Sequence, residues 1–297
     1  MGSDNLRELN IATNSAEPAG YDVTLLAKAR DLSFPSLTRI YCSLTSGVMD
    51  ALDEAHVLHA TYLDDLTICC TDYEYRILPE FLPSVALKRY AFHHSGYDLD
   101  VEVSIFPGWS RPLTSSIASL QSLELTIRSP IELVECGLPA LLERGNSFSQ
   151  LKAVSLAMAY DQRFDAFIPL LMLCPRVQDL ALSTDVTGLS SLHHFGHLIN
   201  SLPNSVALKR LIVGLRIWDL QIAFRHRSMP HIPPNESFDN HLAIFMQFVS
   251  AQRLKSFKIR VSRRSLEAFG FPQVAEVCRS RRIAFAVEWH PNPGMRV

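Results

Sequence analysis

The sequence has little net charge and no long hydrophobic run, and both absences narrow the possible functions. Lys and Arg number 28 against 30 Asp and Glu, which gives a formal net charge of −2. A general nucleic-acid or anionic-membrane binder is excluded, because its affinity would rest on a large positive excess. No stretch of about 18 uncharged apolar residues could span a membrane, and residues 1–10 lack the apolar core of a signal peptide. We therefore expect an intracellular protein, cytoplasmic or nuclear, that binds neither nucleic acid nor membrane.

Cysteine is also scarce, and it lacks the spacing of a disulfide framework. We expect the cysteines to act as small buried apolar side chains, except that strand alternation sends the adjacent Cys69 and Cys70 to opposite faces, one buried and one concave. The six positions are Cys42, Cys69, Cys70, Cys136, Cys174 and Cys278. Wholesale disorder is excluded as well, because 47% of the residues are hydrophobic and only 20% are charged.

Short motifs of the common enzyme classes are absent. The sequence has no G-x-G-x-x-G, G-x-x-x-x-G-K-[ST], H-E-x-x-H or C-x-x-C. Residues 145–149 come closest to the nucleophile elbow G-x-S-x-G, but they end in Ser and lead into a strand instead of a helix. His194 and His197 could place two imidazoles on one metal, yet of the acidic and thiol residues only Asp185 is near them. We expect no enzyme activity, no catalytic residue, no metal and no cofactor.

A pattern of apolar residues, L-x-x-L-x-L with substitutions, recurs along the whole chain. Successive copies begin about 24 to 33 residues apart, with one interval of about 46, near the upper end of the range of leucine-rich repeats. Two copies share the string S-V-A-L-K-R, at 84–89 and 205–210. The nine copies are Leu6-Leu9-Ile11, Leu37-Ile40-Cys42, Leu63-Leu66-Ile68, Leu87-Tyr90-Phe92, Leu120-Leu123-Leu125, Leu151-Val154-Leu156, Val177-Leu180-Leu182, Leu208-Leu211-Val213 and Leu254-Phe257-Ile259.

Each copy predicts one short strand with a single buried face, because its last two apolar positions alternate with polar ones. Between strands the apolar spacing becomes helical, at 48–58, 131–142, 164–172 and 242–249. The predicted fold class is α/β: a leucine-rich-repeat horseshoe solenoid with a parallel β-sheet on the concave face and helices on the convex face. An ordinary doubly wound α/β domain is the alternative, but its strands would be continuously apolar.

The domain prediction is a single solenoid of about nine repeats over residues 1–297. Residues 283–289 alternate as a final strand. Prolines predict a loop-like insertion around 222–240, because proline cannot sustain a helix interior or a central strand. The first repeat begins at Leu6 with no polar capping unit before it, so the N-terminal cap is expected to be missing.

Two repeats resemble a particular protein family. Residues 170–182, LLMLCPRVQDLAL, resemble the L-L-x-x-C-P-x-L-x-x-L-x-L unit of F-box leucine-rich-repeat proteins, and 34–40, FPSLTRI, resemble their F-P-x-L-x-x-L variant. The irregular spacing is similar to that of the fungal members. The resemblance implies repeats that hold a protein to be ubiquitinated, beside an N-terminal F-box that docks a cullin-ligase adaptor. No F-box is found before the repeats, and Leu78–Leu82, which resembles its opening, lies inside the third repeat. An adaptor is therefore expected as a partner only if an F-box lies upstream.

The polar positions of the predicted strands would point into the concave face and contact a protein ligand. The predicted partner-binding residues are Arg39, Tyr41, Asp65, Thr67, Arg89, His93, Glu124, Asp179, Arg210, Lys258 and Arg260. Arg39, Tyr41 and Arg89 are the first candidate anchors, because Arg and Tyr carry much of the energy at protein interfaces. Two interpretations stay open: substrate-recognition repeats of an F-box-like ubiquitin-ligase receptor, or a regulatory protein that binds or inhibits an enzyme without any link to ubiquitin. An inert, solvated wall is the simplest alternative to both.

Overall fold

The computed structural model describes the chain in twelve segments. These are residues 5–11, 36–43, 62–70, 86–94, 111–127, 147–158, 164–184, 189–202, 208–215, 234–250, 253–262 and 271–290. The chain divides into two compact units, Met1–Leu151 (unit 1) and Lys152–Val297 (unit 2).

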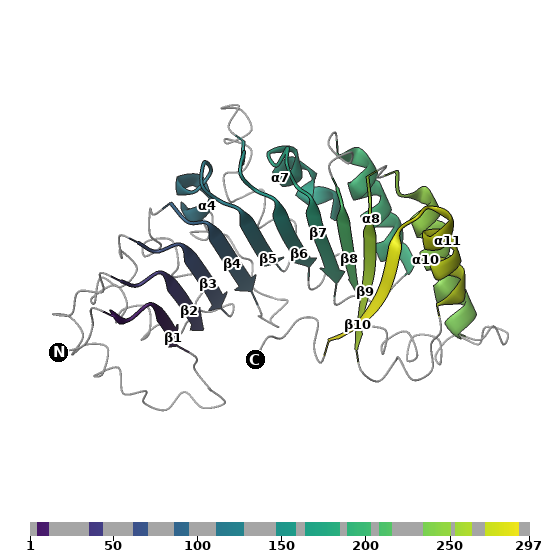
Figure 1. Ribbon diagram of the computed structural model, residues 1–297, viewed down its shortest axis with the longest axis horizontal. Helices are drawn as coiled ribbons and strands as arrows, with labels where there is room; N and C mark the ends of the chain where they lie inside the picture. Colours follow the sequence, from purple (N-terminus) through teal and green to yellow (C-terminus); the bar gives the residue numbers. More distant parts are fainter. Residues whose placement is uncertain are drawn as a thin grey trace, which may run out of the picture. The chain divides into compact units, whose positions relative to one another are not determined.

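Unit 1 is built on five parallel strands that lie side by side in chain order (Figure 1). Each strand pairs with the next one along the chain. The strands are β1 (Glu8–Ile11), β2 (Arg39–Ser43), β3 (Asp65–Cys70), β4 (Arg89–His94) and β5 (Ser122–Ile127). The described residues of this unit also include a short helix, α4 (Arg111–Ser115).

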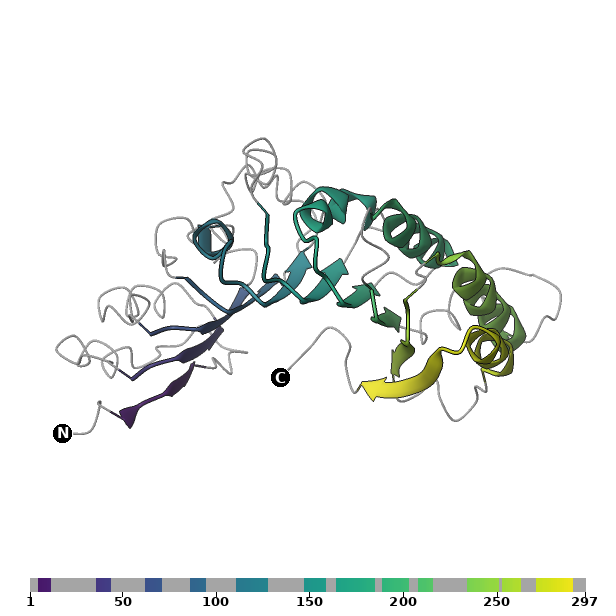
Figure 2. The same ribbon diagram turned by 45° about the horizontal axis from the view of Figure 1, so that its top comes forward.

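Unit 2 repeats this arrangement and adds longer helices. Its strands are β6 (Ala153–Met158), β7 (Asp179–Thr184), β8 (Arg210–Leu215), β9 (Ser256–Ser262) and β10 (Ala284–His290), again parallel and paired in chain order. Its helices are η5 (Phe164–Phe167), α7 (Ile168–Met172), α8 (Leu189–Ser201), α10 (Pro234–Phe248) and α11 (Pro272–Ser280). Figure 2 shows these helices on one side of the strands. The predicted α/β class with parallel strands is confirmed, and every predicted strand is present.

The strands form where the sequence alternates, because only one of their faces is buried. In β5, Leu123, Leu125 and Ile127 are buried while the residues between them are partly exposed. The apolar residue that opens a copy of the pattern, such as Leu120 before β5, is buried just ahead of its strand in eight of the nine copies, whereas Leu6 before β1 is partly exposed. The interior of each unit is therefore lined by the repeated apolar positions.

A repeated hydrogen-bond pattern ties each coil to the next at the point where a strand begins. The carbonyl of Lys88, just before β4, accepts the N–H groups of Gln121 and Ser122 at 2.8 and 3.1 Å. Carbonyls at the matching position of other coils accept two N–H groups in the same way: Arg7, Thr38 and Asp64 in unit 1, and Lys152, Gln178 and Lys209 in unit 2. Successive coils thus repeat one backbone geometry within each unit.

Side chains from neighbouring coils cap the helix ends of unit 2. Asp239 of α10 is 3% exposed and accepts the N–H groups of Gln273 and Val274 at the start of α11, at 2.8 and 3.0 Å. Arg281 donates to the carbonyls of Met246 and Val249 at the other end of α10. These bonds satisfy backbone groups that a helix end leaves without a partner inside the helix.

The predicted helices fare differently. Those at 164–172 and 242–249 are confirmed by η5, α7 and α10, whereas those at 48–58 and 131–142 lie outside the described residues. The loop predicted around 222–240 is wrong for 234–240, because α10 already begins at Pro234. The N–H groups of a helix's first turn form no hydrogen bond within the helix, so proline, which has no N–H, can begin a helix although it would break a helix interior. Residues 222–233 lie outside the described residues.

Candidate functional site

The candidate site is the side of the strands opposite the core, here called the polar face. The structure places every predicted partner-binding residue on this face, partly or fully exposed. Arg39 and Tyr41 lie on β2, Asp65 and Thr67 on β3, Arg89 and His93 on β4, Glu124 on β5, Asp179 on β7, Arg210 on β8, and Lys258 and Arg260 on β9. Their positions agree with the sequence pattern, while their role in binding stays a prediction.

Strand register arranges the polar face of unit 1 in three rows that run across the strands. The first row is Glu8, Arg39, Asp65, Arg89 and Ser122; the second is Asn10, Tyr41, Thr67, Ala91 and Glu124; the third is Ser43, Cys69, His93 and Thr126. Neighbours in a row are about 4.8 Å apart along the sheet, so their side chains can interact directly.

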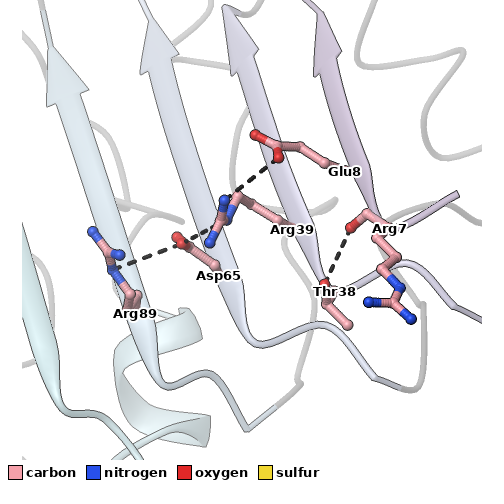
Figure 3. A network of polar contacts seen from close by, with 6 residues as sticks. All are labelled: Arg7, Glu8, Thr38, Arg39, Asp65 and Arg89. Atoms are coloured by element: carbon pink, nitrogen blue, oxygen red, sulfur yellow. Dashed lines mark hydrogen bonds and ion pairs between the residues drawn. The ribbon is translucent and has the colours of Figure 1, made fainter.

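The first row is a ladder of alternating charge. Arg39 Nη1 lies 3.4 Å from Glu8 Oε2, and Arg39 Nε lies 3.2 Å from Asp65 Oδ2 (Figure 3). Arg89 Nε approaches the same Asp65 oxygen at 3.7 Å. The Asp65 side chain is 16% exposed, against 52% for Arg39 and 62% for Arg89. The two arginines therefore share one mostly covered carboxylate, and neither is an isolated charge.

The third row holds polar groups that bond to the second row or within the third row. The Cys69 thiol donates to the Tyr41 hydroxyl at 3.5 Å, and His93 Nδ1 lies 3.0 Å from Thr126 Oγ1. Burial raises the pKa of the Cys69 thiol and the Glu124 carboxylate adds to the rise, which together outweigh the lowering by Tyr41. Cys69 is thus a protonated thiol at neutral pH, which is a poor nucleophile.

Glu124 differs from the other acidic residues of the polar face. Within the described part of the chain, Glu8, Asp65, Asp179 and Glu288 all form ion pairs, whereas Glu124 forms none. Its neighbour in the row is Ala91, whose side chain is short. Glu124 consequently presents a carboxylate that no described cation balances.

The polar face of unit 2 carries two charge clusters. Arg210 donates through Nε and Nη2 to both carboxylate oxygens of Asp179. Glu288 on β10 accepts from Lys258 and, at 3.3 Å, from Arg260. Donation from Lys258 and Arg260 lowers the pKa of the Glu288 carboxyl below its usual range, despite partial burial that acts in the opposite direction.

The predicted partner-binding residues did not include Cys69 and Glu288, which complete these clusters. Both occupy positions equivalent to predicted ones on neighbouring strands, as Cys69 aligns with His93 and Glu288 with Arg260. Applying the repeat to every strand, including the final one, would have identified them.

The histidines considered as metal ligands lie on α8, away from the strands. The ring contacts join His193 to His194 at 6.1 Å and His193 to His197 at 5.2 Å, between ring centroids. Within the described segments, no group of three or more His, Cys, Asp or Glu residues is placed to hold a metal ion. The pair spaced for a metal in the sequence, His194 and His197, is not the closest pair in the structure.

Comparisons with known proteins add no relative: no protein-family model matches the sequence, and no curated protein matches it. The family resemblance therefore depends on the motifs of this chain alone. Among the helices of the described segments, none has the length and apolar character needed to cross a membrane.

Proposed function

We propose that this chain is a noncatalytic protein-binding module, and that its polar face is the concave face of a leucine-rich-repeat horseshoe. The observation that carries the proposal is the polar face itself. In both units it presents register-aligned charged and polar side chains, and in unit 2 the described helices all lie on the other side of the strands. A large, ordered array that no described helix covers suits a protein ligand better than a small molecule.

The leucine-rich-repeat assignment is supported by the coil geometry. From the second copy onward, each described repeat buries its opening apolar residue, and within each unit the N–H groups at a strand start bond to the preceding coil. A structural unit that cannot close its own core and instead stacks on its neighbour is the defining property of solenoid repeats.

The finer proposal is the substrate-recognition part of an F-box-like ubiquitin-ligase receptor. Its support is the motif at 170–182, whose Cys174 is buried and donates its thiol to the Leu170 carbonyl at 3.1 Å. Cysteine therefore fills a structural position at the end of α7, as a repeat consensus requires. The ubiquitin connection itself rests on the motif resemblance.

Noncatalytic action is supported by the chemistry of the polar face. Its arginines and most of its carboxylates neutralise one another, and burial keeps the Cys69 thiol protonated. Such groups can exchange an internal partner for one on a ligand, and exposed ion pairs of this type contribute little to stability.

Affinity capture with the full chain tests the proposal. Tyr41→Ala combined with Glu124→Lys alters the polar face of unit 1, while Gln247→Lys alters the exposed helix side of unit 2. We expect partner affinity to fall at least about tenfold for the polar-face variant and to be unchanged for the helix variant. Equal capture by all three proteins would refute a binding role for this face.

The identity of the captured proteins separates the two interpretations. A cullin-ligase adaptor, recovered when any upstream sequence is present, together with a partner that accumulates when the gene is deleted, supports the receptor. An enzyme whose activity changes on addition of the purified chain, without ubiquitination, supports the regulatory alternative and excludes the ubiquitin proposal.

A further inference from the structure

The residues just before the strands of unit 2 form a continuous row. Lys152, Gln178, Lys209 and Lys255 directly precede β6, β7, β8 and β9. Their backbones are bonded in succession, with each N–H donating to the carbonyl of the previous residue in the row at 2.8 Å. The three lysines are therefore held along one edge of the sheet by the coil geometry itself.

Positive charge on this edge is exposed and has no ion-pair partner among the described residues. Lys152, Lys209 and Lys255 are exposed, as are Arg176 and Arg253, each two residues earlier in its coil than the row. We call these five residues the basic edge. None forms an ion pair with any residue in the segments that the structure describes, and Lys209 Nζ donates to the neutral amide oxygen of Gln178 at 2.9 Å. The segments that lead into these strands, 147–152, 173–178, 203–209 and 250–255, contain no Asp or Glu.

Unit 1 treats the same positions differently. There the residues before the strands are Arg7, Thr38, Asp64, Lys88 and Gln121, and Lys88 pairs with Asp64 at 2.8 Å. In unit 2 the nearest carboxylate on the strands, Asp179, is already held by both donor groups of Arg210. The basic edge is thus a local accumulation of cations in a chain whose formal net charge is −2.

We propose that the basic edge binds an acidic segment of the protein partner, in an extended conformation across the strands. This inference rests on the proposed function and specifies its ligand. Lys209 and Lys255 precede adjacent strands, about 4.8 Å apart along the sheet, while Lys152 lies two strands from Lys209 with Gln178 between them. Cations this close repel one another, and a ligand that brings carboxylates relieves this repulsion. An extended peptide places same-side carboxylates about 6.6 Å apart, a spacing that flexible lysine side chains can follow.

A protein segment fits the edge better than nucleic acid does. Nucleic-acid affinity grows with the number of phosphates neutralised, and single strands also stack on aromatic rings. None of the five residues of the basic edge is aromatic, and Phe148, the aromatic residue in the segment before β6, is buried. A short row of point charges without a stacking surface is suited to carboxylates.

Fluorescence anisotropy with the full chain tests the inference. The probe is a fluorescein-labelled peptide of alternating Glu and Ser, measured at about 50 mM salt, where the screening length exceeds 10 Å. The variant K152Q/K209Q/K255Q removes the lysines of the row. The control R7Q/K88Q/R279Q removes the same number of positive charges elsewhere. We expect Kd to rise about tenfold or more in the first variant and less than about threefold in the control, with binding that weakens as salt is added.

Three results would overturn the inference. An equal loss of peptide affinity in the two variants would assign binding to the net charge of the protein. If a peptide of alternating Gln and Ser bound as tightly as the Glu/Ser peptide, binding would not be electrostatic. Tighter, lysine-dependent binding of oligothymidine would point to nucleic acid instead. The proposed function and the basic-edge proposal can fail separately. If the polar-face variant keeps all partners while the triple-lysine variant loses the peptide, the proposed function is refuted and peptide binding at the basic edge is retained.

Discussion

Asp65 determines how the two candidate arginine anchors of unit 1 behave. Its carboxylate is mostly covered and pairs with Arg39 on one side and Arg89 on the other, while both arginines remain more than half exposed. Pairs that leave the guanidinium group exposed contribute about 0–1 kcal/mol, so a ligand carboxylate can compete with Asp65 for either arginine. The row of alternating charges holds the two guanidinium groups in position and leaves them able to pair with a ligand carboxylate.

Asp239 is the residue whose loss we expect to be most costly. Asp239→Ala removes the acceptor of two N–H groups at the start of α11 and leaves that of buried Val274 inside the protein without this partner. We expect the free energy of unfolding to fall by about 1–3 kcal/mol, measured by urea denaturation. Asp239→Asn keeps one acceptor oxygen and should lose less.

Asp165 in η5 supplies the matched control, because it is exposed. Asp165→Ala should change the free energy of unfolding by less than about 0.5 kcal/mol. If Asp239→Ala had an effect equally small, the buried carboxylate would not be what joins α11 to α10.

At the scale of the element, β8 depends on a glycine. A Cβ added to Gly214 would lie 2.8 Å from the Cβ of Ser183, its partner in β7. Gly214→Ala should therefore destabilise the protein by about 1–3 kcal/mol, because neither backbone can move far in a paired strand. Thermal unfolding of Gly214→Ala, Ser183→Gly and the double variant measures the coupling. Full rescue of Gly214→Ala by Ser183→Gly is expected, and strictly additive losses would contradict the proposed clash.

The elements differ in how far the sequence predicts them. Strands are predictable, because an opening leucine followed by strict alternation of apolar and polar residues fits a half-buried strand and does not fit helical spacing. Helix α8 was missed although Leu192, Phe195, Leu198 and Ile199 are buried at helical spacing, since three histidines interrupt the apolar pattern. Helix α11 buries only Val274 and Cys278, which is too weak a signal to identify in a sequence.

The sequence predicts on which face of the sheet the residues of the candidate site lie, but it does not predict which of them form ion pairs. The sequence places Arg39, Asp65 and Arg89 on the exposed side of their strands. Which of them meet depends on register between coils that begin about 24 to 26 residues apart, and a one-residue slip would turn each side chain to the other face. The Lys258–Glu288 pair needed, in addition, the exact start of β10.

At the scale of the whole molecule, free cysteines lie in the cores of both units. Cys42 of unit 1 and Cys174 and Cys278 of unit 2 are at most 2% exposed, and burial raises the pKa of each, that of Cys278 to about 11. At neutral pH they are almost wholly protonated and covered. We expect their labelling by a maleimide to be at least about a hundredfold slower in the native protein than in urea, read peptide by peptide by mass spectrometry.

Cys69 provides the internal comparison for that experiment. It is partly exposed on the polar face, so it should label faster than the three core cysteines in the same native sample. Native labelling of Cys42, Cys174 or Cys278 at the rate of the unfolded chain would contradict the burial described for that unit.

The paired N–H groups that bond to one carbonyl at each strand start have a consequence for how the chain can vary. Within each unit they fix the phase of a strand against the previous one, from β1 to β5 and from β6 to β9. Insertions and deletions in the connections between strands can accumulate without changing the register of neighbouring strands. Selection would then keep the number of residues around each strand start constant, even where the loops change in length. Repeat proteins of this type can therefore have repeats of unequal length whose strands still pair in register.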